Sequence, residues 1–266
     1  MIPNLHICLL PMPIKWGNKE ANLNYLEEKL REVHPGTDLL ILPEMFSTGF
    51  ITSGKEEVRA LAERNSGETV DFLKRLAARH GLAIAGSFIA DTGGSLFNRA
   101  FFIDSYGEEA FADKRHLFTM GGEDKIFSAG DSRLSVRYRG WNISMVVCYD
   151  IRFPVWCRNK ENEYDLLIAV ANWPKARVEA WTHLLKARAL ENLSYVCGVN
   201  CTGTDLNGYP YDGASHVFDF KGADISMRSD NSDLIYASLS HEKLLSFRQK
   251  FPAWKDADSF EINLDI

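Results

Sequence analysis

Short apolar runs that alternate with amphipathic helical stretches constrain the fold of this chain more than any other feature. The helical stretches span residues 20–33, 68–80 and 178–192, where apolar side chains recur every third or fourth residue. Strands that alternate with helices predict an α/β fold with a layered sheet. The apolar runs, rich in Ile, Leu and Val, occupy residues 6–10, 39–42, 83–89, 98–103, 135–138, 143–147, 166–171, 195–200, 216–219 and 234–238.

Two glycines help to delimit these elements. Gly81 follows the second helical stretch, where it suits a C-terminal cap. Gly140 lies within RLSVRYRGWNISMVV, between two strand-like segments, and predicts an antiparallel hairpin there. The chain has no heptad repeat, low-complexity tract or long Gly/Ser linker, so residues 1–266 are predicted to form a single domain.

Composition bounds the class of protein and its partners. The 266 residues are 45% hydrophobic, enough for a sizeable core, and the net charge of −6 argues against nucleic acid or an anionic membrane as a main partner. Five cysteines without a disulfide-framework spacing favour a reducing compartment. The N-terminal segment MIPNLHICLLPMPIKW lacks a basic leader, and no apolar stretch approaches the roughly 20 residues that span a bilayer. We expect a cytoplasmic protein.

Chemically useful residues follow three of the apolar runs. Glu44, Cys148 and Trp173 each come after the carboxyl end of a predicted strand, in LLILPE, ISMVVC and LLIAVANW. In open α/β sheets, binding sites collect at the carboxyl ends of strands. If these strands are neighbours, the three side chains converge on one edge of the sheet.

A thiol, a carboxylate and an ammonium form a set that can hydrolyse a carbon–nitrogen bond. Taken singly, Cys148 reads as an inert core residue, Glu44 as a helix cap or surface acid, and Lys114 in ADKRHLF as a solvated charge. Taken together they favour a catalytic site, because a buried lysine needs negative partners and the other two groups supply them.

The strings that carry these residues resemble a known signature. LPEMFSTGF, DKRHLF and VVCYDIRFP, in that order, look like the Glu–Lys–Cys signature of the nitrilase superfamily of carbon–nitrogen hydrolases, and VANWP and ARALEN match its small amidase branch. The resemblance extends from the first strand to about Phe220 and is closest to the omega-amidases, which hydrolyse the terminal amide of 2-oxo acid amides. It implies a four-layer α-β-β-α sandwich and a homodimer that extends the sheets.

The resemblance also implies roles for the residues. Glu44 is expected to act as the general base and Cys148 as the nucleophile, while Lys114 and the Tyr149 backbone N–H stabilise the oxyanion. No metal and no organic cofactor is expected. Glu123, nine residues after Lys114, lies near where superfamily members carry a second glutamate.

For some residues the sequence leaves two interpretations open. Glu123 is either that supporting glutamate or a surface acid beside its acidic neighbour. Arg152 either forms a structural pair with Asp150 or binds a substrate carboxylate; the carbamoylase branch has a further arginine where this chain has Ile151. Aromatic side chains that could line a pocket, or belong to the plain core, are Phe46, Phe118 and Trp173.

Other polar residues favour structural roles. His116 is expected to satisfy the local turn, and no partner string supports a papain-like Cys–His site. The polar stripe of ARALEN predicts structural ion pairing or a dimer contact by Arg188, Glu191 and Asn192. The cysteines predicted to be buried, without a zinc-site spacing, are Cys157, Cys197 and Cys201.

The function predicted from this resemblance is hydrolysis of small 2-oxo dicarboxylate monoamides, such as 2-oxoglutaramate or 2-oxosuccinamate. The alternatives within the superfamily are a deaminated-glutathione-like amide, an N-carbamoyl amino acid or a nitrile as substrate. A non-catalytic dimeric scaffold is the alternative from another class, and the complete Glu–Lys–Cys set argues against it.

Overall fold

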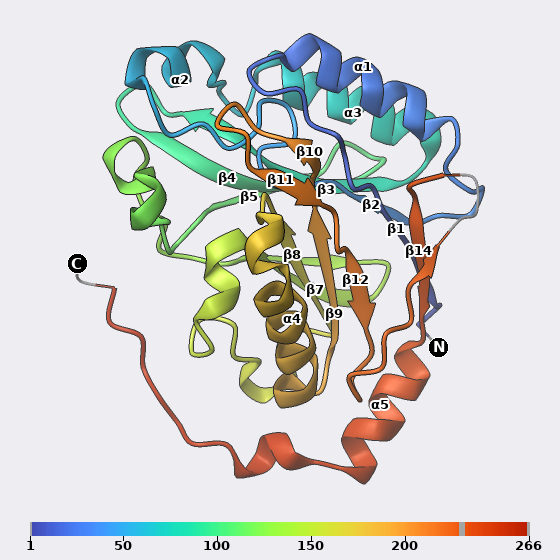
Figure 1. Cartoon of the computed structure of the whole chain (residues 1–266). Helices are drawn as coiled ribbons and strands as arrows, with labels where there is room; N and C mark the ends of the chain where they lie inside the picture. Colours follow the sequence, from blue (N-terminus) through green and yellow to red (C-terminus); the bar gives the residue numbers. More distant parts are fainter. Residues whose placement is uncertain (1, 229–231, 265–266) are drawn as a thin grey trace.

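Two β-sheets packed face to face form the centre of the computed structural model, which describes residues 2–228 and 232–264 (Figure 1). The larger sheet has the strand order β13-β14-β1-β2-β3-β4-β5 and the smaller one β12-β9-β8-β7-β6. The larger sheet consists of β1 (Leu5–Leu9), β2 (Leu39–Ile41), β3 (Ala83–Asp91), β4 (Leu96–Ile103), β5 (Glu109–Asp113), β13 (Met227–Arg228) and β14 (Ile235–Leu239). The smaller sheet consists of β6 (Leu134–Tyr138), β7 (Trp141–Val147), β8 (Leu166–Ala171), β9 (Tyr195–Asn200) and β12 (His216–Phe218).

Helices cover the outer face of each sheet. The structure contains α1 (Lys19–Leu30), α2 (Lys55–Leu61), α3 (Glu68–His80), α4 (Val178–Asn192) and α5 (His241–Lys250). α1 and α3 lie against the larger sheet and α4 against the smaller one, so the layers run α-β-β-α as expected (Figure 1). In the described part of the chain, no helix has the length and apolar character needed to cross a membrane.

The apolar runs are continuous because both faces of each sheet are covered. In β1, Ile7 faces the core between the sheets, whereas Cys8 faces the layer of α1 and α3. In β7, Met145 faces the core between the sheets and Val146 packs with α4. Successive side chains of a strand point to opposite faces, so a strand in the middle of either sheet needs apolar residues at both positions.

The predicted strands are all present, with ends shifted by one or two residues. The hairpin predicted around Gly140 is also confirmed: β6 pairs with β7 antiparallel, with Tyr138 opposite Trp141. Its two turn residues, Arg139 and Gly140, have φ angles of 50° and 88°. These left-handed values are those of a tight two-residue hairpin turn, which favours glycine.

Differences from the predicted elements have local causes. The helix predicted over 20–33 ends at Leu30, where the backbone bonds tighten to a spacing of three residues. A proline at position 35 then disfavours helical backbone at His34. Val33 still packs on the same core from the turn that follows. The strand β5 and the helices α2 and α5 were not predicted, and most of their side chains are partly or fully exposed.

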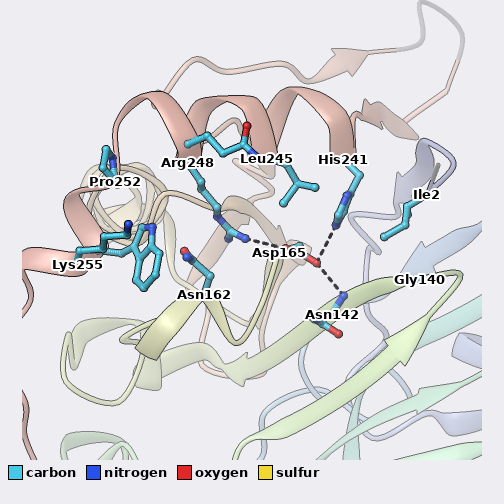
Figure 2. A pocket seen from close by; sticks show the side chains of 12 residues that line it. Ile2, Gly140, Asn142, Asn162, Asp165, His241, Leu245, Arg248, Pro252 and Lys255 are labelled. Atoms are coloured by element: carbon cyan, nitrogen blue, oxygen red, sulfur yellow. Dashed lines mark hydrogen bonds and ion pairs between the residues drawn. The ribbon is translucent and has the colours of Figure 1, made fainter.

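A buried ion cluster fastens α5 to the smaller sheet (Figure 2). The carboxylate of Asp165 accepts from Arg248 Nη1 at 2.8 Å and from the backbone N–H of Asn142 at 3.1 Å, and His241 Nε2 lies 3.4 Å from it. Arg248 also donates to the backbone carbonyl of Leu193. A cavity of about 510 Å³ adjoins this cluster. Because the charged groups pair with one another, the cluster is structural.

Candidate active site

Three of the predicted site residues meet where strands of the two sheets end. Cys148 follows β7 and Trp173 closely follows β8, and these strands are parallel neighbours in the smaller sheet. Glu44 follows β2, which belongs to the larger sheet, so the residues converge across two sheets and not along one edge as expected. Asn172 joins the two sides: its backbone N–H donates to Glu44 Oε2 at 2.9 Å and its Nδ2 donates to the Glu44 carbonyl at 2.7 Å.

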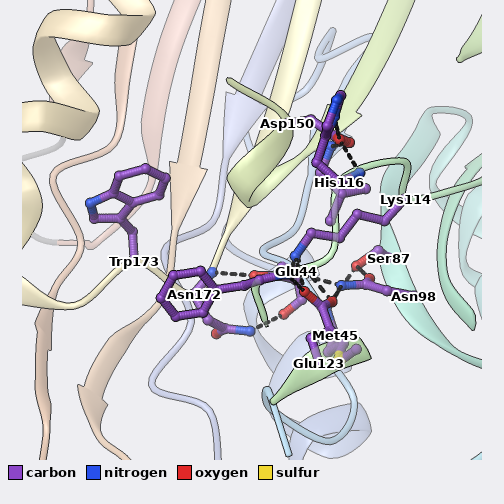
Figure 3. Close-up of polar contacts among 12 residues, drawn as sticks. Glu44, Met45, Ser87, Asn98, Lys114, His116, Glu123, Asp150, Asn172 and Trp173 are labelled. Atoms are coloured by element: carbon purple, nitrogen blue, oxygen red, sulfur yellow. Dashed lines mark hydrogen bonds and ion pairs between the residues drawn. The ribbon is translucent and has the colours of Figure 1, made fainter. Parts of the chain in front are cut away.

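A buried cluster of two carboxylates and one ammonium lies at this junction (Figure 3). Lys114 Nζ donates to Glu44 Oε1 at 2.9 Å and to Glu123 Oε2 at 2.9 Å, and all three side chains are fully buried. Glu123 Oε2 also accepts the backbone N–H of Phe118 at 2.6 Å. Glu123 is therefore not the surface acid that one interpretation of the sequence offered.

A cavity of about 650 Å³ opens beside this cluster. Phe118, Tyr149 and Trp173 line it, whereas Phe46 is buried in the core with its ring 5.9 Å from that of Phe101, so its interpretation as a pocket residue is wrong. The full lining is Glu44, Phe50, Thr52, Lys114, Phe118, Met120, Gly121, Cys148, Tyr149, Arg152, Asn172, Trp173, Pro174, Arg177, Asp205, Asn207, Tyr209 and Tyr211.

The comparison with known families matches this geometry to a family of hydrolases. The model of the carbon–nitrogen hydrolase family matches residues 7–249. The chain belongs to this family. The hydrolase is 40% identical to omega-amidase YafV of Escherichia coli, over 98% of this chain and all of that protein. It is 29% identical to a 2-oxoglutaramate amidase of Bacillus subtilis, over 94% of this chain and 96% of that protein.

A solved structure shares both fold and sequence with the hydrolase. The crystal structure of a carbon–nitrogen hydrolase superfamily protein from Xanthomonas campestris, with an arsenic adduct in its active site, is 39% identical. The two superpose with a TM-score of 0.91, over 98% of this chain and 99% of that chain. The family, predicted from the three strings around Glu44, Lys114 and Cys148, is therefore confirmed. The omega-amidase branch, for which VANWP and ARALEN gave further matches, is confirmed as well.

The hydrolase holds Cys148 at a sharp turn that follows β7. Its backbone φ of 48° lies in the left-handed region, which costs a non-glycine residue roughly 1–3 kcal/mol and persists only where neighbouring bonds enforce it. Asp150 supplies these bonds, because Oδ2 accepts the Val147 N–H at 3.0 Å and Oδ1 accepts the His116 N–H at 2.8 Å. The turn directs the sulfur toward the cavity, whose lining it joins.

Asp150 and Arg152 do not form the structural pair that one interpretation proposed. Among the described residues, Asp150 pairs with His116, whose Nδ1 lies 2.8 Å from Oδ1, and this bears out a turn role for the histidine. The guanidinium of Arg152 instead lies over the Trp173 ring, 4.8 Å from its centre, and lines the cavity. Trp173 is fixed in turn by Asn200, which accepts its backbone N–H at 2.7 Å.

Burial and the charges of the cluster shift the pKa values of Lys114 and Cys148. Burial lowers the pKa of Lys114, but the negative charges of Glu123 and Glu44 outweigh it and hold that pKa well above its ordinary value. Burial raises the pKa of the Cys148 thiol, and the charge of Glu44 raises it further against the opposing effect of Lys114. The raised pKa favours the neutral thiol, so a base beside the sulfur is needed to form the thiolate.

Several residues of the site were missed by sequence reasoning. Asn98 donates to Glu44 and Glu123, Asn172 binds Glu44, and Arg177 lines the cavity with its guanidinium 5.5 Å from the centre of the Phe118 ring. Asn98 offered one signal, since it is a polar residue in the apolar run FNRAFFI. Asn172 and Arg177 lie in or just after VANWP, where only the tryptophan was singled out.

The remaining predicted residues are structural. Arg188 donates to the carbonyl of Ile151 at 2.7 Å and to Glu191 at 2.8 Å, which confirms ion pairing and also braces the turn after Cys148. Asn192 bonds to the backbone of Asn159. Cys157, Cys197 and Cys201 are buried as predicted. Within residues 2–228 and 232–264, no group of three or more His, Cys, Asp and Glu side chains is placed to hold a metal ion.

Proposed function

We propose that the chain is an omega-amidase that hydrolyses the terminal amide of small 2-oxo dicarboxylate monoamides, such as 2-oxoglutaramate and 2-oxosuccinamate. The observation that carries the proposal is the buried Glu44–Lys114–Glu123 cluster beside Cys148 at the end of a cavity. The relatives named omega-amidase and 2-oxoglutaramate amidase, matched over nearly the whole chain, support this substrate class.

The reaction follows from the protonation of the site. Glu44 takes the thiol proton while Cys148 Sγ attacks the amide carbon, and Lys114 with the Tyr149 backbone N–H stabilises the oxyanion. One such donor contributes about 3 kcal/mol in the transition state. Glu44 then gives the proton to the leaving nitrogen, so ammonia departs and a thioester remains. Water, deprotonated by Glu44, cleaves the thioester, releases the acid and restores the thiol.

Ammonia release from a substrate panel tests the proposal. We expect kcat/KM for 2-oxoglutaramate to exceed that for an uncharged amide of equal length by at least about a hundredfold, since only the first carries a carboxylate that pairs with a cation of the cavity. We expect it also to exceed kcat/KM for a nitrile and for an N-carbamoyl amino acid. A preference for the nitrile or the carbamoyl compound would assign the chain to another activity of the family. Failure of every compound to acylate Cys148, followed by mass spectrometry, would indicate a scaffold.

Arg152 is proposed to bind the substrate carboxylate. Its guanidinium is half-buried over Trp173 and has no carboxylate partner among the described residues, so it is free to form a bidentate pair. We expect Arg152→Gln to raise KM for 2-oxoglutaramate by about 10–100-fold with a smaller change in kcat, because the lost contact exists before and during the reaction. The rate with an uncharged amide should change little.

Two further variants control this experiment. Arg177→Gln removes the other guanidinium of the lining, but Arg177 is exposed, and we expect a smaller rise in KM from it. Lys175→Gln removes an exposed charge that lies outside the lining and should leave KM unchanged. A larger effect of Arg177→Gln than of Arg152→Gln would reassign the carboxylate contact.

We also propose a cytoplasmic homodimer. The buried and free cysteines are compatible with a reducing compartment, and the family resemblance favours pairs of subunits that extend the sheets. Analytical ultracentrifugation at assay concentrations tests the dimer, and a monomer mass would contradict it.

A further inference from the structure

Asn98 bonds to all three charged residues of the buried cluster (Figure 3). Its side-chain Nδ2 donates to Glu44 Oε1 at 2.7 Å and to Glu123 Oε1 at 3.1 Å. Its backbone carbonyl accepts the Lys114 N–H at 2.9 Å. Asn98 is fully buried in β4, so no water replaces these bonds from outside. Both hydrogens of the amide are thus used on the two carboxylates.

The orientation of this amide is fixed by Ser87. Ser87 Oγ accepts the Met45 N–H at 2.8 Å and therefore directs its own hydrogen to Asn98 Oδ1, 3.0 Å away. The opposite orientation would place Oδ1 against carboxylate oxygens with no hydrogen between them. The bonds therefore run in one direction, from Met45 through Ser87 and Asn98 to Glu44 and Glu123.

These contacts leave one acceptor position of Glu44 free. A carboxylate oxygen accepts about two hydrogen bonds. Glu44 Oε1 accepts from Lys114 at 2.9 Å and from Asn98 at 2.7 Å, so it is saturated. Oε2 accepts from the Asn172 N–H at 2.9 Å and keeps a second position open. That open position is where the proton of Cys148 can be received.

The net charge of the cluster explains why a neutral donor is needed. Burial raises the pKa of Glu123, and the charge of Glu44 raises it further against the opposing charge of Lys114. When both carboxylates are ionised, two negative charges face one positive charge, so one negative charge stays uncompensated without solvent. A second cation would compensate it but would weaken Glu44 as a base. The amide of Asn98 stabilises both carboxylates by hydrogen bonds and adds no charge.

We infer that Asn98 is a positioning residue, which holds the carboxylates of Glu44 and Glu123 side by side and leaves Glu44 Oε2 to take the Cys148 proton. The inference rests on the proposed function, because it concerns the same reaction. Alkylation of Cys148 by iodoacetamide needs the activated thiol but no amide substrate. It therefore tests Asn98 even if the amide substrate proposed above is wrong.

The experiment compares the wild type with Asn98→Ala across a pH series, with alkylation of Cys148 followed by mass spectrometry. Without the amide, the two carboxylates lose the hydrogen bonds that favour their charged forms, so the acidic limb of the rate profile should move upward by about one pH unit. At neutral pH kcat for ammonia release should fall about 10–100-fold, with KM changed less than about threefold.

Two variants keep the test decisive. Ser87→Ala leaves the Asn98 side chain in place but allows its amide to rotate, so we expect a smaller shift of the acidic limb in the same direction. If Asn98→Ala does not fold, the Ser87→Ala variant tests the inference in its place. Asn159→Ala removes another buried asparagine, bonded to Tyr164 and Asn192 away from the cavity, and should leave the acidic limb in place. An unshifted limb in Asn98→Ala, or an equal shift in Asn159→Ala, would overturn the inference.

Discussion

Replacing Cys148 with alanine is expected to lower kcat for ammonia release from 2-oxoglutaramate by at least about a thousandfold. The sulfur is the atom that would form the thioester, so its loss leaves Glu44 with a base function and nothing to deprotonate. The side chain lies at the cavity and is only partly buried, so folding should be preserved. Steady-state ammonia release, together with circular dichroism of the same samples, measures both effects.

Cys157→Ala is the matched control for this variant. Cys157 is fully buried and its Sγ lies 3.4 Å from the carbonyl of Asp150, so its removal leaves a small cavity. We expect Cys157→Ala to lower the melting temperature yet keep most of kcat, the opposite pattern to Cys148→Ala. Residual turnover of Cys148→Ala above about one thousandth of the wild type would refute the nucleophile assignment.

The proposed catalytic residues were predictable because each lies in a distinctive string at the end of a strand or turn. Glu123 was predictable by its spacing from Lys114, but its full burial was not, since its neighbours in MGGEDKIF are polar. Asn98 and Asn172 could not be assigned, because their partners lie 54 and 128 residues away along the chain. Such contacts depend on how the two sheets face each other, which local patterns do not encode.

The fold shows the same division between local and non-local information. Strands were predicted correctly where both faces are buried, because their apolar runs are continuous. Their order was not predictable: β1 pairs with β14 at the other end of the chain, with Leu5 opposite Leu239. The strand β5 was missed because its five residues are all at least partly exposed. Yet Lys114 follows β5 directly, so a strand that was not predicted positions a site residue that was.

Glu44→Gln is expected to separate thiol reactivity from catalysis. Glutamine has the same size but cannot take the thiol proton, so kcat for ammonia release should fall at least about a thousandfold. Burial raises the pKa of Cys148 and the charge and hydrogen bond of Glu44 raise it further, so the substitution should lower that pKa. The alkaline limb of the rate of Cys148 alkylation by iodoacetamide should therefore move to lower pH in the variant, while turnover is lost.

Glu123→Gln provides the comparison that makes this dissociation specific. The charge of Glu123 also raises the pKa of Cys148, but by less than the charge of Glu44 does. The alkaline limb of the alkylation rate in Glu123→Gln should therefore shift in the same direction by a smaller amount. Because Glu44 stays available as the base, Glu123→Gln should retain more turnover than Glu44→Gln. Two results would contradict the assignment of Glu44 as the base. One is an alkaline limb that moves to higher pH in Glu44→Gln, and the other is equal turnover in Glu44→Gln and Glu123→Gln. The two carboxylates contact the same ammonium. The proposed proton acceptor is Glu44, whose Oε2 accepts the Asn172 N–H and keeps one acceptor position open.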